Sequence, residues 1–317
     1  MRMPDLHGVF VPLLTPIFEN GEIDHIGLFN LAKLFLSLPY VNGLLVLGTT
    51  GEYAFLDYEK KIKIIETVSQ IPGNKKPVII NASANDQNEE KKIIRNAAQK
   101  KFSAVCLVLP AEIASDMEKA VYYIQTMHLS GFPFVLYWPP ALAAKPSCRL
   151  LEKIINIPEF VGLKDSSRDM AEFTRICAGY SAEISIFQGV ESLYLPSLAV
   201  GCTGIIGGGF NLYPRLAQCI KEAFDRHDLG SAICYQEELA ALWERINEKK
   251  TFRSVCKQYW KTKGIIAGTS CLQGDNIKIQ RSEYLFIDSI TEKYLTNYSQ
   301  QDLPRVCEEQ DCSILVK

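Results

Sequence analysis

The sequence of 317 residues has no apolar run long enough to cross a membrane, and its first apolar stretch is interrupted by Pro4, Pro12 and Pro16. A membrane span needs about 18 or more apolar residues in succession. Long basic runs are also absent, because 34 Lys and Arg stand against 36 Asp and Glu, for a net charge of -2. Nucleic acid and anionic membranes are therefore poor partners. We expect a soluble, cytoplasmic protein without a targeting signal, acting on a small molecule.

Metal-binding patterns are missing as well. The ten cysteines contain no C-x-x-C pair, and with no secretory signal we expect them to be reduced, mostly buried thiols. Four histidines are far apart in the chain and show no ligand spacing: His7, His25, His128 and His227. A dedicated zinc site is therefore not expected, and metal-dependent chemistry becomes a minor hypothesis.

What the chain has is a regular alternation of short apolar runs with longer amphipathic ones. The expected strands are Val9–Leu14, Gly43–Leu47, Pro77–Asn81, Ala104–Leu109, Pro133–Trp138, Phe160–Lys164, Ile184–Gln188 and Gly204–Gly207. The expected helices between and after them are Asp24–Ser37, Asp57–Gln70, one from about Gln87, Asp116–Ser130, Ser147–Ile155, Arg168–Tyr180, Glu191–Val200 and Pro214–Arg226. Eight such units predict an α/β fold, a (β/α)8 TIM barrel. A doubly wound sheet fits this pattern less well, since it usually has fewer strands and a glycine-rich first turn that is absent here.

After His227 the pattern becomes helical throughout. Helices are expected at Ser231–Asn247, Thr251–Ile265 and Leu285–Thr296, and the polar stretch Ser299–Lys317 is expected to be loosely held. We therefore divide the chain into a catalytic barrel, residues 1–226, and a C-terminal helical extension, residues 227–317.

One apolar strand ends in a lysine. Residues Phe160–Ser167 read F-V-G-L-K-D-S-S, and the polar cluster after the strand has the features of a helix start, with Ser166 three residues before Asp169. Burial of Lys164 among apolar neighbours disfavours its charged form, and a neutral amine is a nucleophile. Lys164 is thus a candidate for forming a Schiff base. Taken alone, a lysine whose stem packs while its ammonium reaches water is the commoner case.

The second strand ends in the loop Gly48–Glu52, with the sequence G-T-T-G-E. Its two glycines bracket Thr49 and Thr50, so backbone N-H groups and hydroxyls can converge on one anion. Gly48, Thr49 and Thr50 therefore form a candidate carboxylate site, although glycine and threonine are also ordinary turn residues.

Two further strand ends carry polar groups. Tyr137, in Y-W-P-P, puts a phenol at the carboxyl end of the fifth strand, where barrel enzymes place their chemistry. Without other information, a buried structural tyrosine is about twice as common as a catalytic one. Glu191 follows the seventh strand, and a glycine-rich segment, Gly204–Asn211, contains the eighth. Together these strand ends suit one small anionic carbonyl substrate.

In this order, the motifs resemble the dihydrodipicolinate synthase and N-acetylneuraminate lyase superfamily. The matching segments are the opening G-V-F-V-P-L-L-T-P, G-T-T-G-E, the tyrosine and proline of Y-W-P-P, G-L-K-D-S-S, G-V-E-S-L-Y-L-P and G-C-T-G-I-I, continuing to Asn211 and Pro214. The resemblance spans roughly residues 8 to 226. Each motif is weak by itself, but their shared order indicates the family and its class I, Schiff-base chemistry.

The resemblance implies a role for each matched residue. Lys164 would form an imine with pyruvate or another 2-oxo acid, and Tyr137 would move the protons. Thr49 and Thr50 would hold the carboxylate, with Thr49 also bonding the tyrosine, and Ile206 would offer its backbone carbonyl. Since the protonated imine accepts the electrons, no metal and no organic cofactor is required. The resemblance also implies a homo-oligomer, a dimer or a homotetramer.

The sequence departs from the family at three places. A tyrosine pair after strand four is replaced by Ala111, Glu112 and Ile113. Where dihydrodipicolinate synthases have an arginine after the strand-five tyrosine, this chain has the apolar segment Ala141–Ala144, although Arg168 could compensate. Sialic acid lyases have an acidic pair where this chain has only Glu191, which remains a candidate substrate-binding residue.

We conclude from the sequence that the protein is a class I lyase, a pyruvate-dependent aldolase for a hydroxy-oxo acid, with aspartate semialdehyde disfavoured as substrate. A dehydratase of a 2-oxo-3-deoxy sugar acid would use the same imine, and dihydrodipicolinate synthase activity also remains open. A barrel that binds a keto acid without turnover is the alternative from another class, favoured by the missing tyrosines.

Overall fold

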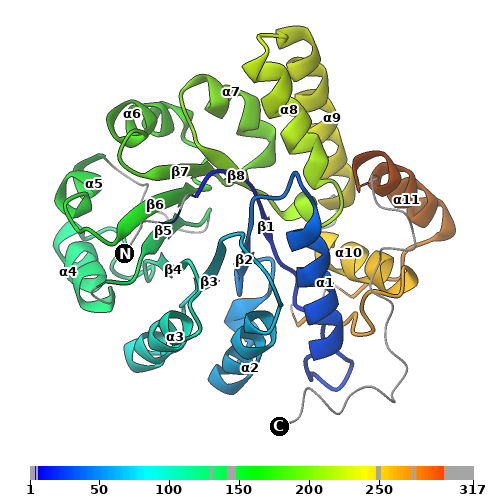
Figure 1. The fold of residues 1–317 in the computed structure, drawn as a ribbon, viewed down its shortest axis with the longest axis horizontal. Coiled ribbons are helices and arrows are strands. Elements are labelled where there is room, and N and C mark those ends of the chain that lie inside the picture. The colour runs from blue at the N-terminus through cyan, green and yellow to red at the C-terminus, as the bar shows by residue number, and fades with distance from the viewer. Residues whose placement is uncertain are drawn as a thin grey trace.

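Eight parallel strands close into one barrel, with each strand hydrogen-bonded to its neighbours in chain order (Figure 1). The computed structural model describes residues 4, 6–128, 131–140, 148–247, 251–272, 274 and 276–295. The strands are β1 (Gly8–Pro12), β2 (Gly43–Val46), β3 (Val78–Asn81), β4 (Ala104–Val108), β5 (Phe134–Trp138), β6 (Phe160–Asp165), β7 (Ser185–Gln188) and β8 (Gly204–Ile206). The barrel predicted from the alternating pattern is confirmed, and all its strands end at one rim.

Helices surround the barrel (Figure 1). They are α1 (His25–Ser37), α2 (Tyr58–Ser69), α3 (Gln87–Gln99), α4 (Met117–Met127), α5 (Cys148–Ile154), α6 (Met170–Tyr180), α7 (Tyr194–Ala199) and α8 (Pro214–Asp225), with short 3-10 turns η1 (Tyr53–Phe55), η2 (Glu191–Leu193) and η3 (Gly208–Asn211). Aspartates begin several helices: the Asp24 side chain accepts a bond from Gly27 N, and that of Asp86 from Asn88 N and Glu89 N. Such caps satisfy backbone donors that the first turn leaves open.

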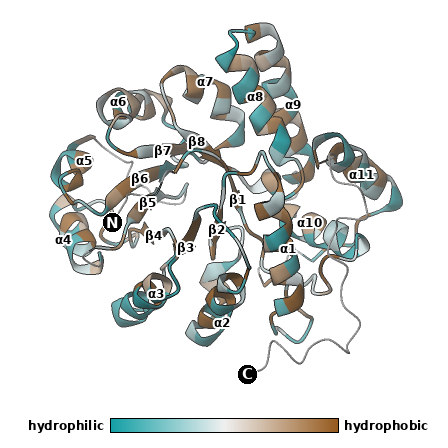
Figure 2. Ribbon diagram, viewed as in Figure 1, coloured by the Kyte–Doolittle hydropathy of each residue, from teal (hydrophilic) through white to brown (hydrophobic). Residues whose placement is uncertain are grey.

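The apolar residues form two layers, one inside the barrel and one between the strands and the helices. Figure 2 shows hydrophobic strands ringed by helices with mixed faces. Inside, Phe10 of β1 and Phe187 of β7 meet edge to face, with ring centres 5.1 Å apart. Tyr137 belongs to this interior group, whereas Phe134, at the start of the same strand, belongs to the outer layer.

An extra residue in β6 decides which way its lysine faces. The pairing of β5 with β6 steps from Phe134–Phe160 to Val135–Gly162, so Val161 is additional. Phe160 lies in the outer layer, and strict alternation would put residue 164 on that same outer side. Because of this bulge, Lys164 pairs with inward-facing Tyr137 instead.

Some expected boundaries were wrong. Helix α6 is capped by Asp169, which accepts a bond from Glu172 N, and not by the earlier Ser166. Strand β6 continues past Lys164 to Asp165. The helix expected from Glu191 to Val200 begins as the 3-10 turn η2 before α7. The expected helix ends at Ser130, Ser147 and Thr296, and the tail from Ser299, lie outside the described residues.

Three helices form the C-terminal extension: α9 (Leu229–Asn247), α10 (Phe252–Thr262) and α11 (Arg281–Leu295). Trp260 of α10 donates its ring N-H to the carbonyl of Asn211 at 2.8 Å. Asp24 accepts bonds from Ala267 N and Gly268 N with its second carboxylate oxygen. The predicted boundary after residue 226 falls between α8 and α9, and these contacts tie the extension to the barrel. No helix in the described part of the chain is both long and apolar enough to span a bilayer.

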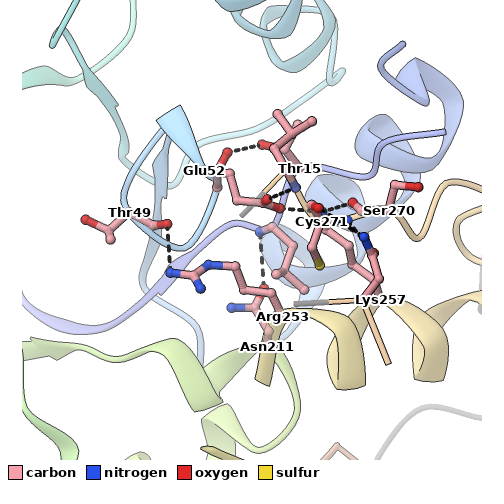
Figure 3. Close-up of polar contacts among 12 residues, drawn as sticks. Thr15, Thr49, Glu52, Asn211, Arg253, Lys257, Ser270 and Cys271 are labelled. Carbon is pink, nitrogen blue, oxygen red and sulfur yellow. Dashed lines mark hydrogen bonds and ion pairs between the residues drawn. The ribbon is translucent and has the colours of Figure 1, made fainter. Parts of the chain in front are cut away.

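A fully buried ion pair joins the extension to the loop after β2 (Figure 3). Lys257 of α10 donates to Glu52 at 2.5 Å and to the carbonyl of Ser270 at 2.6 Å. The other oxygen of Glu52 accepts a bond from Leu272 N at 2.6 Å. Glu52 itself takes a left-handed conformation, with φ of 61°. Both charges are thus satisfied where water cannot reach them, and the pair fixes the end of the G-T-T-G-E loop.

Replacing Lys257 with Met should leave the Glu52 carboxylate buried without its cation, and lower the free energy of unfolding by about 3–5 kcal/mol. The double variant Glu52→Gln with Lys257→Met removes both charges and should lose clearly less. Denaturant unfolding of the three proteins tests this. Equal losses in the single and double variants would show that the pair itself contributes little.

Candidate active site

A cavity of about 190 Å³ opens at the rim where the strands end. It collects residues from β1, from the loops after β2, β7 and β8, from β5 and β6, and from the extension. Its lining consists of Pro12, Thr49, Thr50, Tyr137, Pro140, Lys164, Ser166, Arg168, Gly189, Val190, Glu191, Ile206, Gly208, Trp243, Phe252 and Arg253. Six of the seven residues singled out from the sequence are in this lining. Gly48 is not among the described lining residues, and its carbonyl accepts a bond from Tyr53 N.

Lys164 and Tyr137 lie side by side in the cavity. They are register partners on β6 and β5, and the lysine Nζ is 4.2 Å from the centre of the tyrosine ring. Both side chains are buried, with exposed fractions of 7% and 6%. Both side chains line the same cavity, so an amine and a phenol can reach one small substrate there. No cluster of three or more His, Cys, Asp or Glu side chains suited to a metal occurs among the residues that the structure describes.

The G-T-T-G-E loop holds its shape through backbone contacts. Thr15 donates its hydroxyl to the carbonyl of Gly51 at 2.8 Å, and Glu52 N donates to the carbonyl of Thr49 at 3.2 Å. A side chain at Gly51 would approach the carbonyl of Leu13 to 2.9 Å, so the close passage of the two loops requires glycine. Thr50 is buried and Thr49 is exposed, and both line the cavity. The bond expected between Thr49 and Tyr137 stays a prediction.

Glu191 is buried at the edge of the cavity and already has two donors. One carboxylate oxygen accepts a bond from Gly209 N at 2.8 Å, and the other from the Tyr213 hydroxyl at 3.3 Å. Burial raises the pKa of Glu191 to about 7, against the opposing effect of these two bonds. The carboxyl therefore joins the loops after β7 and β8, and its predicted contact with substrate stays a prediction.

The glycines at positions 207–209, after β8, leave room for close packing of Glu191, Tyr213 and the rings of the extension. A side chain at Gly207 would meet Glu191 at 2.6 Å, and one at Gly209 would meet the Tyr213 hydroxyl at 2.0 Å. One at Gly208 would touch the rings of Phe252 and Trp243. Ile206, just before this run, is buried in the barrel interior beside its register partner Phe10 and lines the cavity, and its expected carbonyl contact with substrate stays a prediction.

Sequence reasoning missed the contribution of the extension. Trp243 of α9 and Phe252 and Arg253 of α10 all line the cavity, with the two rings 5.1 Å apart. Arg253 is 8% exposed, and its Nη2 donates to the carbonyl of Thr49 at 3.4 Å (Figure 3). The only local signal was an aromatic residue and an arginine at the start of an expected helix.

The departures from the family pattern also have a place in the structure. Residues 110–114 form a turn after β4, in which Ile113 N and Ala114 N both donate hydrogen bonds to the carbonyl of Pro110. The apolar segment 141–144 lies outside the described residues, so its expected contact with substrate stays a prediction. Arg168 is exposed with φ of 66° and lines the cavity, as required if it is to replace the arginine after strand five.

Comparison with known proteins gives the family. The model of the Dihydrodipicolinate synthetase family matches residues 5–274. The chain belongs to this family. The match extends past the barrel through α10, so it includes the part of the extension that lines the cavity.

Relatives of two activities are similar to the chain. The 4-hydroxy-tetrahydrodipicolinate synthase of Nitratidesulfovibrio vulgaris is 28% identical over 239 residues, 74% of this chain and 81% of that protein. The N-acetylneuraminate lyase of Rattus norvegicus is 27% identical over 239 residues, 73% of this chain and 75% of that protein. The protein is thus a lyase of this family, with class I aldolase chemistry, and its relatives leave the substrate open.

Solved structures agree in fold. The N-acetylneuraminate lyase of Fusobacterium nucleatum, solved with pyruvate, superposes with a TM-score of 0.80 at 22% identity, covering 92% of this chain and 97% of that one. Dihydrodipicolinate synthase of Aquifex aeolicus gives 0.79 at 22% identity, covering 92% and 98%. Both likenesses place the barrel and the extension in one shared fold.

Glu191 gives the protein a pH-dependent stability. The native carboxyl keeps its proton up to about pH 7, whereas an unfolded chain loses it near the usual 4.5. Between these values the native state binds more protons, so the free energy of unfolding falls as pH rises. In the wild type the free energy of unfolding should therefore be lower at pH 8 than at pH 5, and Glu191→Gln should reduce this difference by roughly 2 kcal/mol.

Denaturant unfolding at the two pH values measures this difference. Glu244→Gln, on an exposed position of α9, is the matched control and should keep the wild-type slope. An unchanged slope in Glu191→Gln would mean that Glu191 titrates in the ordinary range in the folded protein.

Proposed function

We propose that the protein is a pyruvate-dependent class I aldolase that cleaves or forms the C3–C4 bond of a 4-hydroxy-2-oxo acid. The observation that carries the proposal is the buried Lys164 amine, 4.2 Å from the Tyr137 ring, in a cavity that also holds Thr49 and Thr50. Such a group of amine, phenol and anion-binding loop fits a substrate with a carbonyl next to a carboxylate.

The chemistry would proceed through an imine on Lys164. The amine adds to the C2 carbonyl, and water leaves with a proton from Tyr137, giving a protonated imine and a phenolate that can accept the next proton. When the C3–C4 bond breaks, its electron pair moves toward the imine nitrogen and forms an enamine. The C4 hydroxyl gives its proton to Tyr137, and an aldehyde leaves. Protonation at C3 and hydrolysis then release pyruvate and restore the free lysine.

The loop after β2 would hold the substrate carboxylate. Thr50 is buried and Thr49 is exposed, and both line the same cavity as the lysine, so hydroxyl and backbone N-H donors can reach the substrate from this loop. Charge-assisted bonds of this kind fix the carbonyl carbon near the amine. Ile206 would contribute its backbone carbonyl from the opposite wall, as the family resemblance implies.

Size and charge favour a small acid over the family's larger or amine-bearing substrates. The cavity of about 190 Å³ is smaller than the roughly 300–1,000 Å³ of pockets for drug-sized ligands. Aspartate semialdehyde carries a carboxylate and an ammonium group, and this cavity is lined by Arg168 and Arg253. These cations would repel its ammonium group, which disfavours it relative to an acid without an amine. A sugar-acid dehydratase, which uses the same imine, remains the second candidate, and a dimer or tetramer is expected from the family.

Borohydride reduction in the presence of pyruvate tests the imine. It should add a reduced pyruvyl group, of about 72 Da, to Lys164, as measured by mass spectrometry of the intact protein and of its peptides. Lys164→Met should abolish the addition, while Lys61→Met, which removes another buried lysine, should keep it. Labelling that persists in Lys164→Met would contradict the assignment.

Tyr137→Phe tests the proton transfer. Loss of the phenol should lower kcat for retro-aldol cleavage by about 10²- to 10⁴-fold, and slow the exchange of pyruvate methyl hydrogens with solvent deuterium. Tyr122→Phe removes an exposed phenol, 70% accessible on α4, and should leave both rates unchanged. Wild-type protein that forms the imine without any exchange would instead support a keto-acid-binding barrel.

A further inference from the structure

We infer that the C-terminal extension carries a second ligand site, an open cavity that binds a small polyanion and thereby stabilises the G-T-T-G-E loop. The cavity has a volume of about 830 Å³ and is lined by α10, the start of α11 and the segment between these helices, which lie together at one side of the barrel (Figure 1). None of its described lining residues also lines the active-site cavity. Sites for small molecules usually have volumes of about 300–1,000 Å³, so this cavity is large enough to hold one.

Side-chain hydrogen bonds fix one wall of this cavity. Gln258 of α10 accepts a bond from Ile279 N at 2.9 Å and donates one to the Ser254 hydroxyl at 3.0 Å. The same hydroxyl accepts a bond from Ile277 N at 3.0 Å and donates to the carbonyl of Ile277 at 3.2 Å. Two side chains of α10 thus hold the segment that closes the cavity, and a ligand meets a preformed site.

The lining of the cavity is cationic. Lys261, Lys278 and Arg281 line it together with one acid, Glu19. Within the residues that the structure describes, none of these three cations forms an ion pair. Lysine and arginine bind phosphate and carboxylate groups through charge-assisted hydrogen bonds. Three cations against one acid therefore favour a ligand with two or more negative charges, such as a phosphate-bearing metabolite or a polycarboxylate.

A residue of the cavity lining also takes part in the contacts that hold the loop after β2. Ser270 lines the cavity, and its carbonyl accepts a bond from Lys257, which also donates to Glu52 (Figure 3). The N-H group of Ser270 donates to the carbonyl of Ile17 at 2.8 Å. A ligand favours the arrangement of the chain to which it binds. Because this arrangement is the one in which Glu52 is held, occupancy of the cavity should stabilise the loop.

Calorimetric titration with inorganic pyrophosphate tests the site. The double variant Lys278→Gln with Arg281→Gln should raise the Kd by about 10-fold or more, because it removes two cationic partners of the anion. Lys33→Gln with Arg95→Gln, at exposed positions of α1 and α3, removes the same charge elsewhere and should bind as wild type. Added salt should weaken binding to the wild type. Titration with citrate compares carboxylates with phosphates, and the tighter ligand names the acidic groups that the site prefers.

Three outcomes would overturn the inference. Wild-type protein that binds neither pyrophosphate nor citrate would leave the cavity without a ligand of this class. Equal losses of affinity in the two double variants would mean that net charge alone attracts the anion. Loss of binding in Arg168→Gln would place the anion in the active-site cavity. Lys278 and Arg281 are exposed, so their double variant should fold and keep the borohydride trapping of pyruvate on Lys164; if it does not fold, the two single variants decide.

The effect on the loop is measured by the same trapping reaction. Saturating pyrophosphate should lower the pyruvate concentration that gives half-maximal trapping on Lys164 by about 5-fold or more, the lower end of the coupling usual between two sites. The double variant Lys278→Gln with Arg281→Gln should lose this shift. Binding of pyrophosphate without a shift, or with a shift in the opposite direction, would contradict the coupling to the loop. This readout alone rests on the proposed function, since a protein without any trapping contradicts that function and leaves the calorimetric test of the site intact.

Discussion

The site depends on the register between two neighbouring strands. Parallel strands pair residue by residue, and in β6 the additional Val161 changes which side of the strand its later residues face. As a result Lys164 points into the barrel beside Tyr137 and not outward with Phe160. A lysine on the outer side would face the helices and not the cavity. One bulged residue therefore places Lys164 in the lining of the cavity.

The second requirement is that the extension covers the strand ends. The Glu52–Lys257 pair has both side chains fully buried, so it holds only while α10 stays against the loop after β2. A buried pair is sensitive to geometry, because each charge loses hydration and depends on the other. Arg253 uses the same helix to reach the carbonyl of Thr49. The loop that is expected to bind the substrate carboxylate is thus held from the barrel side by Thr15 and from the extension side by α10.

The sequence predicts much of this fold because its signals are local. Alternating apolar runs indicate the strands, and aspartates such as Asp24 and Asp57 mark helix starts, all of which the structure confirms. The bulge in β6 is different, since F-V-G-L is apolar at every position and reads the same in either register. The choice between Ser166 and Asp169 as helix cap is similar, because both residue types can cap and only the path of the backbone decides.

The part of the cavity lining that comes from the extension is unpredictable from the sequence for another reason. Thr49 and Arg253 are 204 positions apart, and Glu52 and Lys257 are 205 apart. Contacts of this range leave no periodic pattern, since they depend on how α10 settles over the barrel. The glycines at 207–209 are the only sequence feature that hints at close packing here, and the same glycines would also be expected in a tight turn. The structure shows that each one faces a different neighbour: Glu191, the rings of the extension and Tyr213.

These long-range contacts also set the charge of the cavity. Burial raises the pKa of Glu191 to about 7, so below this value the carboxyl is neutral and adds no charge to the cavity. As pH rises through 7 the carboxyl ionises, and a negative charge appears in the cavity that is to receive an anionic substrate. In a space shielded from water such a charge acts strongly on its neighbours. Above pH 7 the ionised Glu191 therefore opposes substrate carboxylates, so one buried side chain links the stability of the barrel rim to the electrostatics of the cavity.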